Sequence, residues 1–343
     1  MAKVMLAMSG GVDSSVAAHL IKAAGFDCIG ATMVLCSDAG VEDAKAVADR
    51  LEIPFYSFNH REDFARLVID DFISCYEQGG TPNPCVTCNK TIKFDVLLQQ
   101  ALKLDCDRLA TGHYAKIKEE NGRFLLYKAA DLAKDQSYFL ACLDQHQLSH
   151  ILFPPGELTK EQASQIAEEQ GFITARKKDS QDICFIPDGD YKAFMERYTG
   201  KSYPDGDYLN REGQVLGRHQ GAVGYTIGQR KGLGIALGEP AYVTEKNMAE
   251  NTVTLGRNED LYRTALLADN WNFIPFDTLD QPMQVKARVR YRHTEQPATV
   301  YPMDNGLAKV VFAEPQRAIT TGQAVVLYDG DLVIGSGTIQ KVL

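Results

Sequence analysis

The sequence predicts an α/β domain with a parallel sheet at its amino-terminal end, followed by smaller β domains. Two observations carry this prediction. In the first part of the chain, short apolar runs alternate with longer segments of helical spacing, an order typical of a parallel sheet covered by helices. From about residue 200 onward, short alternating runs are separated by Gly, Asn and Asp, which is typical of small β domains or barrels.

The elements of the α/β part follow in chain order from their apolar spacing and their end signals. Strands are predicted at residues 2–8, 27–35, 54–59 and 106–115, and helices at residues 12–25, 41–53, 61–80 and 92–104. A hairpin is predicted at residues 114–129, turning at Asn121-Gly122. A Thr-x-x-Gln capping box at Thr159 begins a further helix that ends at Gly171.

Length, charge and hydropathy set the broad class. The 343 residues allow two or three domains, and the change in composition predicts limits at 1–198, 199–260 and 261–343. The net charge of −9 argues against bulk affinity for nucleic acid, although a local basic patch can still bind RNA. No apolar run approaches the ~18 residues needed to span a bilayer. Since the amino terminus also lacks a signal-peptide cleavage site, we expect a cytoplasmic protein without a membrane partner.

The stretch MSGGVDSS, residues 8–15, lies between a predicted strand and a predicted helix. Gly10 and Gly11 let the backbone approach an anion closely, and the helix N-terminus adds partial positive charge. An isolated Gly-Gly is more often an ordinary turn, but here strand, turn and helix follow in the order of a phosphate site. The loop lacks the Gly-Lys-Ser/Thr ending of a Walker A loop, which disfavours kinase-like transfer of a γ-phosphate.

The eight cysteines do not make a disulfide scaffold in a chain of this length, so paired spacing indicates metal, cluster or catalytic chemistry. Cys85 and Cys88 form a CxxC at the entry to a helix, whose N-terminus is expected to lower a thiol pKa. Cys184 lies in a segment with no clear period. The remaining five are expected to be buried and to behave as small hydrophobes: Cys28, Cys36, Cys75, Cys106 and Cys142.

Four kinds of site compete for Cys85, Cys88 and Cys184. Zinc is disfavoured because there is only one CxxC and no following His pair. A thioredoxin-like redox pair would require a different fold around it. Three cysteines can hold an iron–sulfur cluster with one open iron, or one cysteine can carry a sulfur while another resolves the mixed disulfide. The residues alone leave these last two open.

The chain resembles the tRNA-specific 2-thiouridylases of the MnmA type, in the ATP pyrophosphatase (PP-loop) superfamily. The matching stretches run from residue 5 to about residue 300 and include SGGVDSSVAA, TPNPCVTCNK, ATGHYA, KDQSYFL, DSQDICFI, GAVGYTIGQRKGLGI and RYRHTEQP. The resemblance implies a PP-loop domain of the adenine-nucleotide alpha-hydrolase-like fold, then a small central β domain and a C-terminal β-barrel.

The same resemblance implies an activity, with its cofactors and partners. ATP and Mg²⁺ would support adenylylation of O2 of wobble uridine 34 in tRNA, and sulfur from a cysteine persulfide would displace AMP to give 2-thiouridine. The implied substrates are the tRNA isoacceptors for lysine, glutamate and glutamine. The implied sulfur donor is a protein such as a cysteine desulfurase or a relay carrier.

The resemblance also assigns roles by position. Cys88 matches the family's nucleophile and Cys184 its persulfide-bearing cysteine, and the two are implied to form a disulfide in one state. The ATP contacts are expected at Ala7, Met8, Ser9, Gly10, Gly11, Val12, Asp13, Ser14, Met33 and Gly112. Asn83, Pro84 and Cys85 are expected to approach the target base, and tRNA contacts are expected at Lys134, Asp135, Gln136, Arg290 and Tyr291.

One departure from the family concerns Cys85, because well-known members carry Asp at this position. The change leaves three cysteines in the region and strengthens a [4Fe–4S] cluster held by Cys85, Cys88 and Cys184 as an alternative to persulfide relay. Relay needs Cys88 and Cys184 within disulfide reach, with Cα atoms within ~7 Å in one state. Since they are far apart in sequence, we expect Cys184 to lie on a segment that moves.

Two further features and two competing functions complete the sequence-based picture. The stretch KARVRYRHTEQP, residues 286–297, alternates like a strand whose cations are expected to contact tRNA phosphates. His113 ends a predicted strand on the ligand-binding side of the sheet, and structural and nucleotide-site roles are equally open. A PP-loop ligase or amidating enzyme for a small molecule would not need Cys88 and Cys184 together. A non-catalytic tRNA-binding or sulfur-carrier module is disfavoured by the intact SGGVDSS.

Overall fold

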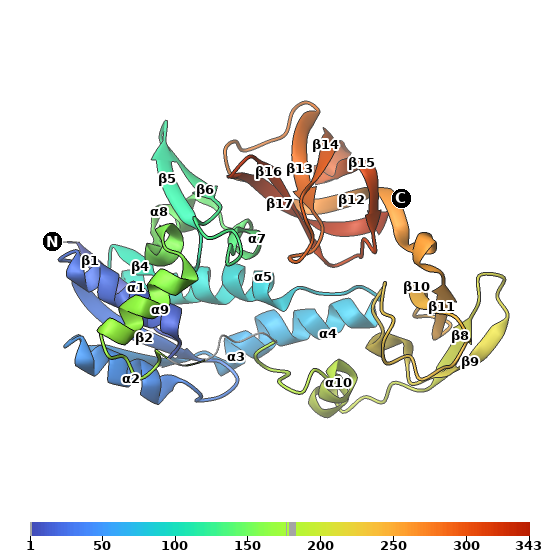
Figure 1. The fold of residues 1–343 in the computed structure, drawn as a ribbon, viewed down its shortest axis with the longest axis horizontal. Coiled ribbons are helices and arrows are strands. Elements are labelled where there is room, and N and C mark those ends of the chain that lie inside the picture. The colour runs from blue at the N-terminus through green and yellow to red at the C-terminus, as the bar shows by residue number, and fades with distance from the viewer. Residues whose placement is uncertain (1, 176, 178–182) are drawn as a thin grey trace.

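The structure is a computed structural model that describes residues 2–175, 177 and 183–343, so part of the DSQDICFI stretch lies outside the described residues. Its amino-terminal part is a five-stranded parallel sheet in the order β3-β2-β1-β4-β7 (Figure 1). The strands are β1 (Lys3–Ala7), β2 (Asp27–Val34), β3 (Phe55–Asn59), β4 (Arg108–Ala110) and β7 (Ile151–Leu152). In the central strand, Val4 pairs with Cys28 on one side and with Arg108 on the other.

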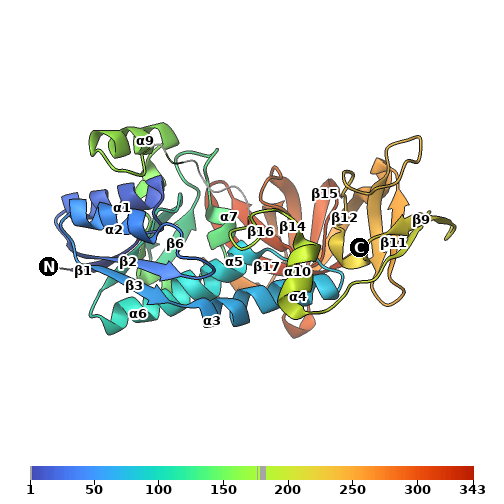
Figure 2. The ribbon, with the colours of Figure 1, turned by 90° about the horizontal axis from the view of Figure 1, so that it is seen from below.

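Helices cover both faces of this sheet, which explains why β1 is apolar at consecutive positions. Figure 2 shows α1 (Val12–Ala23), α2 (Val41–Arg50) and α9 (Lys160–Glu169) on one face. Val4 and Leu6 point to that face and pack in one core with Val16 of α1. Met5 points the opposite way and packs against Phe94 and Leu97 from the helix that includes α6 (Leu97–Lys103).

Two long helical runs extend from the sheet toward the other domains (Figure 1). The first comprises α3 (Arg61–Phe64), a π-helical segment (Ala65–Ile69) and α4 (Asp70–Glu77), close to the predicted 61–80. The second comprises α5 (Pro84–Cys88), a π-helical segment (Asn89–Val96) and α6. The predicted start at residue 92 is therefore wrong, because Asn83 caps the helix through its side chain and Pro84 occupies the first turn.

Smaller elements connect these parts. They are α7 (Ser137–Leu140), α8 (Gln145–Ser149), a 3₁₀ turn (Pro154–Glu157) and α10 (Tyr191–Thr199). The capping box at Thr159 is confirmed, since Thr159 accepts from the Gln162 amide and the Gln162 side chain accepts in return. No helix of the described residues has the length and apolar character needed to cross a membrane.

The central and C-terminal parts are β structures, as predicted. The central sheet has the order β10-β11-β8-β9 and consists of β8 (Gly206–Leu209), β9 (Val215–His219), β10 (Tyr242–Asn247) and β11 (Thr252–Gly256). The C-terminal strands are β12 (Tyr262–Phe273), β13 (Met283–Arg288), β14 (Gln296–Pro302), β15 (Ala308–Arg317), β16 (Ala324–Asp329) and β17 (Leu332–Val342). Pairing of β12 with β17 closes these six strands into a barrel.

The predicted hairpin is β5 (Lys116–Glu120) and β6 (Arg123–Tyr127), and it joins the barrel sheet through the pairing of Tyr127 with Leu332. Its turn residues both have positive φ, 51° at Asn121 and 76° at Gly122, as a two-residue hairpin turn requires. The predicted continuous strand at 286–297 is wrong. The chain must reverse there, because Ala287 of β13 pairs antiparallel with Gln296 of β14.

Candidate active site

The predicted phosphate loop connects β1 to α1 at the carboxyl edge of the sheet. Gly10 has φ +71°, and a Cβ there would lie 2.4 Å from the carbonyl oxygen of Gly40. Gly11 is the N-cap of α1 in an extended conformation, so the first amides of the helix follow it directly. This arrangement of a glycine turn and a helix N-terminus is suited to binding an anion.

The loop hydroxyls stabilise the turn itself. The Ser14 hydroxyl accepts from the Ser9 amide at 3.2 Å and donates to the Gly11 carbonyl at 3.0 Å. The Ser15 hydroxyl donates to the same carbonyl at 2.8 Å and lies 3.0 Å from the Thr174 hydroxyl. These contacts fix the loop conformation before any ligand binds.

Residues from three neighbouring strands meet at this edge. The loop follows β1, Met33 lies near the end of β2, and Gly112 follows β4. Gly112 approaches the first turn of α1 so closely that a Cβ would lie 2.5 Å from the Ser14 amide nitrogen. The structure therefore brings together the positions expected to contact ATP, because parallel strands end at the same edge of a sheet.

Asp13 is held by two groups that the sequence analysis did not single out. The Tyr114 hydroxyl donates to Asp13 Oδ1 at 2.8 Å, and Lys160 Nζ donates to the same oxygen at 2.7 Å. Lys177 adds a second cation at the loop, since its Nζ donates to the Gly10 carbonyl at 3.0 Å and to Asp43 at 2.6 Å. The position of Lys160 at the start of a capped helix was the only available signal for its role.

Asp13 is also the residue that fits Mg²⁺ at the loop. Mg²⁺ in nucleotide sites is commonly held by one or two carboxylates together with substrate phosphates. Among the residues that the structure describes, no three His, Cys, Asp or Glu side chains are arranged to hold a metal ion. A metal at this loop would therefore depend on Asp13 and on the phosphates of the nucleotide.

The CxxC lies in the first turns of the second long helix, and its two thiols differ. Cys85 is exposed, whereas Cys88 is buried in an apolar cluster with Ile92 and Phe185. Burial raises the pKa of both thiols, and the charge of Lys93 opposes this shift only in part. The expectation that the helix N-terminus lowers their pKa is therefore wrong, because desolvation outweighs it.

Cys184 lies beside a cysteine that was expected to be buried. Cys36 is exposed two residues after the end of β2, and its Sγ lies 3.7 Å from the carbonyl oxygen of Cys184. A hydrogen bond between the two thiols lowers the pKa of Cys36 to about 6 and raises the pKa of Cys184. Cys85 and Cys88 also act electrostatically on Cys184, so four thiols share one region.

The other cysteines are distributed largely as expected. Cys28, Cys106 and Cys142 are buried, and Cys75 is half-buried. Cys36 is the error, because a position just beyond the carboxyl end of a strand faces the ligand edge rather than the core. All eight thiols are free in this structure. As they stand, Cys85, Cys88 and Cys184 do not form the ligand set of a cluster, and no step below depends on one.

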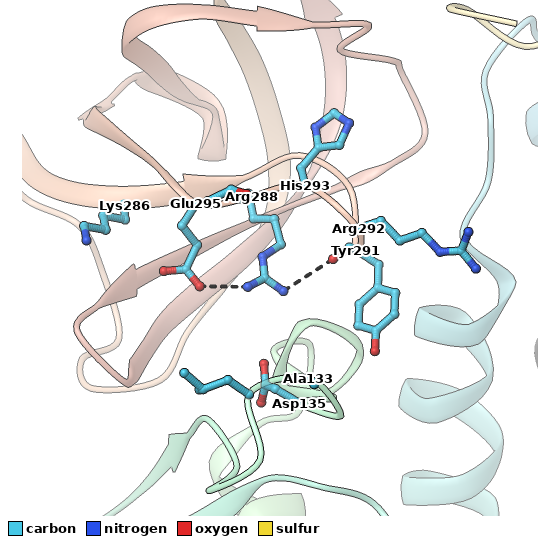
Figure 3. A pocket seen from close by; sticks show the side chains of 10 residues that line it. Ala133, Asp135, Lys286, Arg288, Tyr291, Arg292, His293 and Glu295 are labelled. Atoms are coloured by element: carbon cyan, nitrogen blue, oxygen red, sulfur yellow. Dashed lines mark hydrogen bonds and ion pairs between the residues drawn. The ribbon is translucent and has the colours of Figure 1, made fainter. Parts of the chain in front are cut away.

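The predicted tRNA contacts lie at the junction of the α/β part and the barrel (Figure 3). An open pocket of about 580 Å³ is lined by Asp135 on one side and by Arg288, Tyr291 and Arg292 on the other. The buried Asp135 carboxylate accepts from the Ser137 hydroxyl at 2.7 Å and from the Ala129 amide at 3.0 Å. Asp135 therefore stabilises its own loop.

Other residues of this group also have structural contacts. Gln136 Oε1 accepts from the Tyr114 amide at 2.9 Å, and the Tyr291 ring packs 4.4 Å from that of Phe139. Arg290 Nη2 donates to the Ile227 and Ala318 carbonyls and to the Thr320 hydroxyl. The exposed cations here are Lys286 and Arg292. Direct contact of Lys134, Asp135, Gln136, Arg290 or Tyr291 with tRNA stays a prediction.

His113 packs between Phe94 and Phe153, at ring-centroid distances of 5.5 and 5.9 Å. Its Nδ1 lies 2.7 Å from the Thr111 hydroxyl. Burial and the nearby charge of Lys93 lower the His113 pKa well below 6.5. The ring is therefore neutral near pH 7, and these contacts favour its structural role.

Comparison with protein families covers almost the whole chain. Residues 2–188 match the tRNA methyl transferase HUP domain, residues 192–257 the tRNA methyl transferase PRC-barrel domain, and residues 263–339 the aminomethyltransferase beta-barrel domain. A protein of Clostridioides difficile named tRNA-specific 2-thiouridylase MnmA is 48% identical over 356 residues, covering 99% of each chain. The chain belongs to the MnmA family of tRNA-specific 2-thiouridylases.

Further MnmA relatives agree. A Clostridium perfringens protein of the same name is 49% identical over 355 residues, and one of Clostridium acetobutylicum is 48% identical over 352 residues. They cover 99% and 98% of this chain and 99% of their own length. The MnmA family assignment confirms the predicted fold class of a parallel sheet, a small central β domain and a C-terminal barrel.

Proposed function

We propose that the chain catalyses ATP-dependent 2-thiolation of uridine in tRNA, at wobble position 34. The observation that supports this most is the position of the thiols relative to the phosphate loop. Cys36 lies four residues before Gly40, which contacts Gly10, and four residues of chain span at most about 14 Å. An activated uridine at the loop would therefore lie near the cysteines.

The chemistry needs two stages, and the site offers residues for each. Uracil O2 is a poor leaving group, and adenylylation converts it to a phosphate ester that leaves as AMP. The amides of α1 and the cations Lys160 and Lys177 suit the binding of a nucleotide polyphosphate. Mg²⁺, when bound beside Asp13, would neutralise phosphate charge.

Sulfur transfer is the second stage. A persulfide on Cys184, loaded by a donor protein such as a cysteine desulfurase or a relay carrier, attacks C2 and AMP leaves. The exposed side chain of Cys184 is accessible to such a donor, whereas Cys88 is buried. Cys88 is proposed to act after a change in position that uncovers it.

The test measures 2-thiouridine directly. The full-length protein is incubated with ATP, Mg²⁺, a sulfur donor and unmodified tRNA for lysine, glutamate or glutamine, and the nucleosides are analysed by mass spectrometry. We expect 2-thiouridine with the wild type and none with Cys184→Ala. Cys28→Ala is the control, because Cys28 lies on β2 at the opposite end from the site. Absence of 2-thiouridine with the wild type would refute the proposal.

A further inference from the structure

Cys36 has no role in the chemistry described so far, yet it is the thiol best placed beside Cys184. The two residues are 148 positions apart in sequence, and the Cys36 Sγ lies 3.7 Å from the Cys184 carbonyl oxygen. Both side chains are exposed. Cys88 is only 8% exposed and packs among apolar side chains that include Ile92 and Ile186.

This arrangement bears on how the disulfide left after sulfur transfer is resolved. Thiol–disulfide exchange requires the attacking sulfur to reach the sulfur under attack, and access limits its rate. Cys36 meets that requirement in the structure as it stands. Cys88 would have to leave its cluster first.

We propose that Cys36 is the resolving thiol for Cys184 and forms a Cys36–Cys184 disulfide in each catalytic cycle. This inference rests on the proposed function, because it assigns a residue to the same reaction. It adds a catalytic role to a position outside the CxxC.

The step balances as follows. After the terminal persulfide sulfur has attacked C2 and AMP has left, that sulfur is bonded both to C2 and to Cys184 Sγ. The Cys36 thiolate attacks Cys184 Sγ, the bond between Sγ and the transferred sulfur breaks, and 2-thiouridine leaves with the electron pair. The two cysteine sulfurs are oxidised to a disulfide while the transferred sulfur is reduced. An external dithiol reductant then regenerates both thiols.

The first experiment needs neither tRNA nor ATP. The full-length reduced protein is oxidised with graded diamide, digested without reductant, and its disulfide-linked peptides are quantified by mass spectrometry. We expect the Cys36–Cys184 peptide to form first and in at least about tenfold excess over Cys88–Cys184. Early formation of Cys88–Cys184 instead would overturn the proposal. This result decides the pairing even if no 2-thiouridine is ever made.

The second experiment follows turnover. Persulfide-loaded protein is given ATP, Mg²⁺ and tRNA without reductant, and disulfides and 2-thiouridine are measured together. We expect one Cys36–Cys184 disulfide for each 2-thiouridine, and at least about tenfold slower release of product with Cys36→Ser. Cys28→Ser is the matched control. Unchanged release by Cys36→Ser, or a Cys88–Cys184 disulfide in the wild type, would overturn the assignment.

Discussion

Replacing Gly112 by alanine tests the inferred coupling between β4 and the phosphate loop. An added Cβ would lie 2.5 Å from the Ser14 nitrogen, 2.6 Å from the Asp13 carbonyl carbon and 2.8 Å from the Asp13 oxygen. All three are backbone atoms of the first turn of α1, so no side chain can rotate away. Ordinary contact begins at 3.4 Å, and the helix must therefore retreat by 3.4 − 2.5 = 0.9 Å.

This displacement sets the expected magnitudes. Overpacking of this kind costs about 1–3 kcal/mol in the free energy of unfolding. A shift of 0.9 Å also exceeds the tolerance of hydrogen bonds from the loop amides to a phosphate. Losing one such bond to a charged group costs about 1.5–3 kcal/mol, so ATP affinity should fall by about tenfold or more.

Thermal denaturation and calorimetric titration with a non-hydrolysable ATP analogue measure the two effects. Gly224→Ala is the matched control, because its Cβ would meet the nearest atom, Lys192 Cβ, at an ordinary 3.6 Å. We expect the control to keep wild-type Tm and affinity. If Gly112→Ala matches the control in both, Gly112 does not position the loop and the reasoning fails.

Three further predictions concern charge at the two ends of the site. Alkylation of Cys36 by iodoacetamide should show a midpoint near pH 6, since thiolate is lost only below that pKa; a midpoint above pH 8, followed by peptide mass spectrometry, would contradict this. Lys160→Met should raise the KM for ATP about tenfold or more, because it leaves Asp13 without its cation; an unchanged KM would place Lys160 outside the nucleotide site. Arg290→Ala should lower Tm by removing a half-buried cation from two carbonyls and a hydroxyl, whereas exposed Arg292→Ala should keep Tm and reduce the salt slope of tRNA binding by about 1. An unchanged Tm for Arg290→Ala, or an unchanged slope for Arg292→Ala, would reverse these assignments.

The local features of the site could be predicted because they depend on residues close in sequence. The glycine turn of the phosphate loop, the capping box at Thr159 and the turn at Asn121-Gly122 all follow from short-range backbone requirements. Strand and helix order followed from apolar spacing. Because parallel strands end at one edge, this order also placed Met33 and Gly112 beside the loop.

Errors arose where burial or long-range packing decides the outcome. The pKa of Cys88 was expected to fall at a helix N-terminus, but the surrounding apolar side chains raise it. The cations at 286–292 were expected to share one face of a strand, but β13 ends at Arg288 and Arg290 turns inward to the Ile227 carbonyl. Neither neighbour set can be read from local sequence.

The sequence by itself determined the α/β order, the β-rich C-terminal half, the phosphate loop and the pairing of Cys88 with Cys184 as candidates. Only the tertiary structure decided that Lys160 binds Asp13, 147 residues away, and that Cys36 lies beside Cys184. The physical reason is that backbone conformation responds to neighbours in the chain. Contact, exposure and thiol pKa respond to atoms that folding brings near, whatever their distance in sequence.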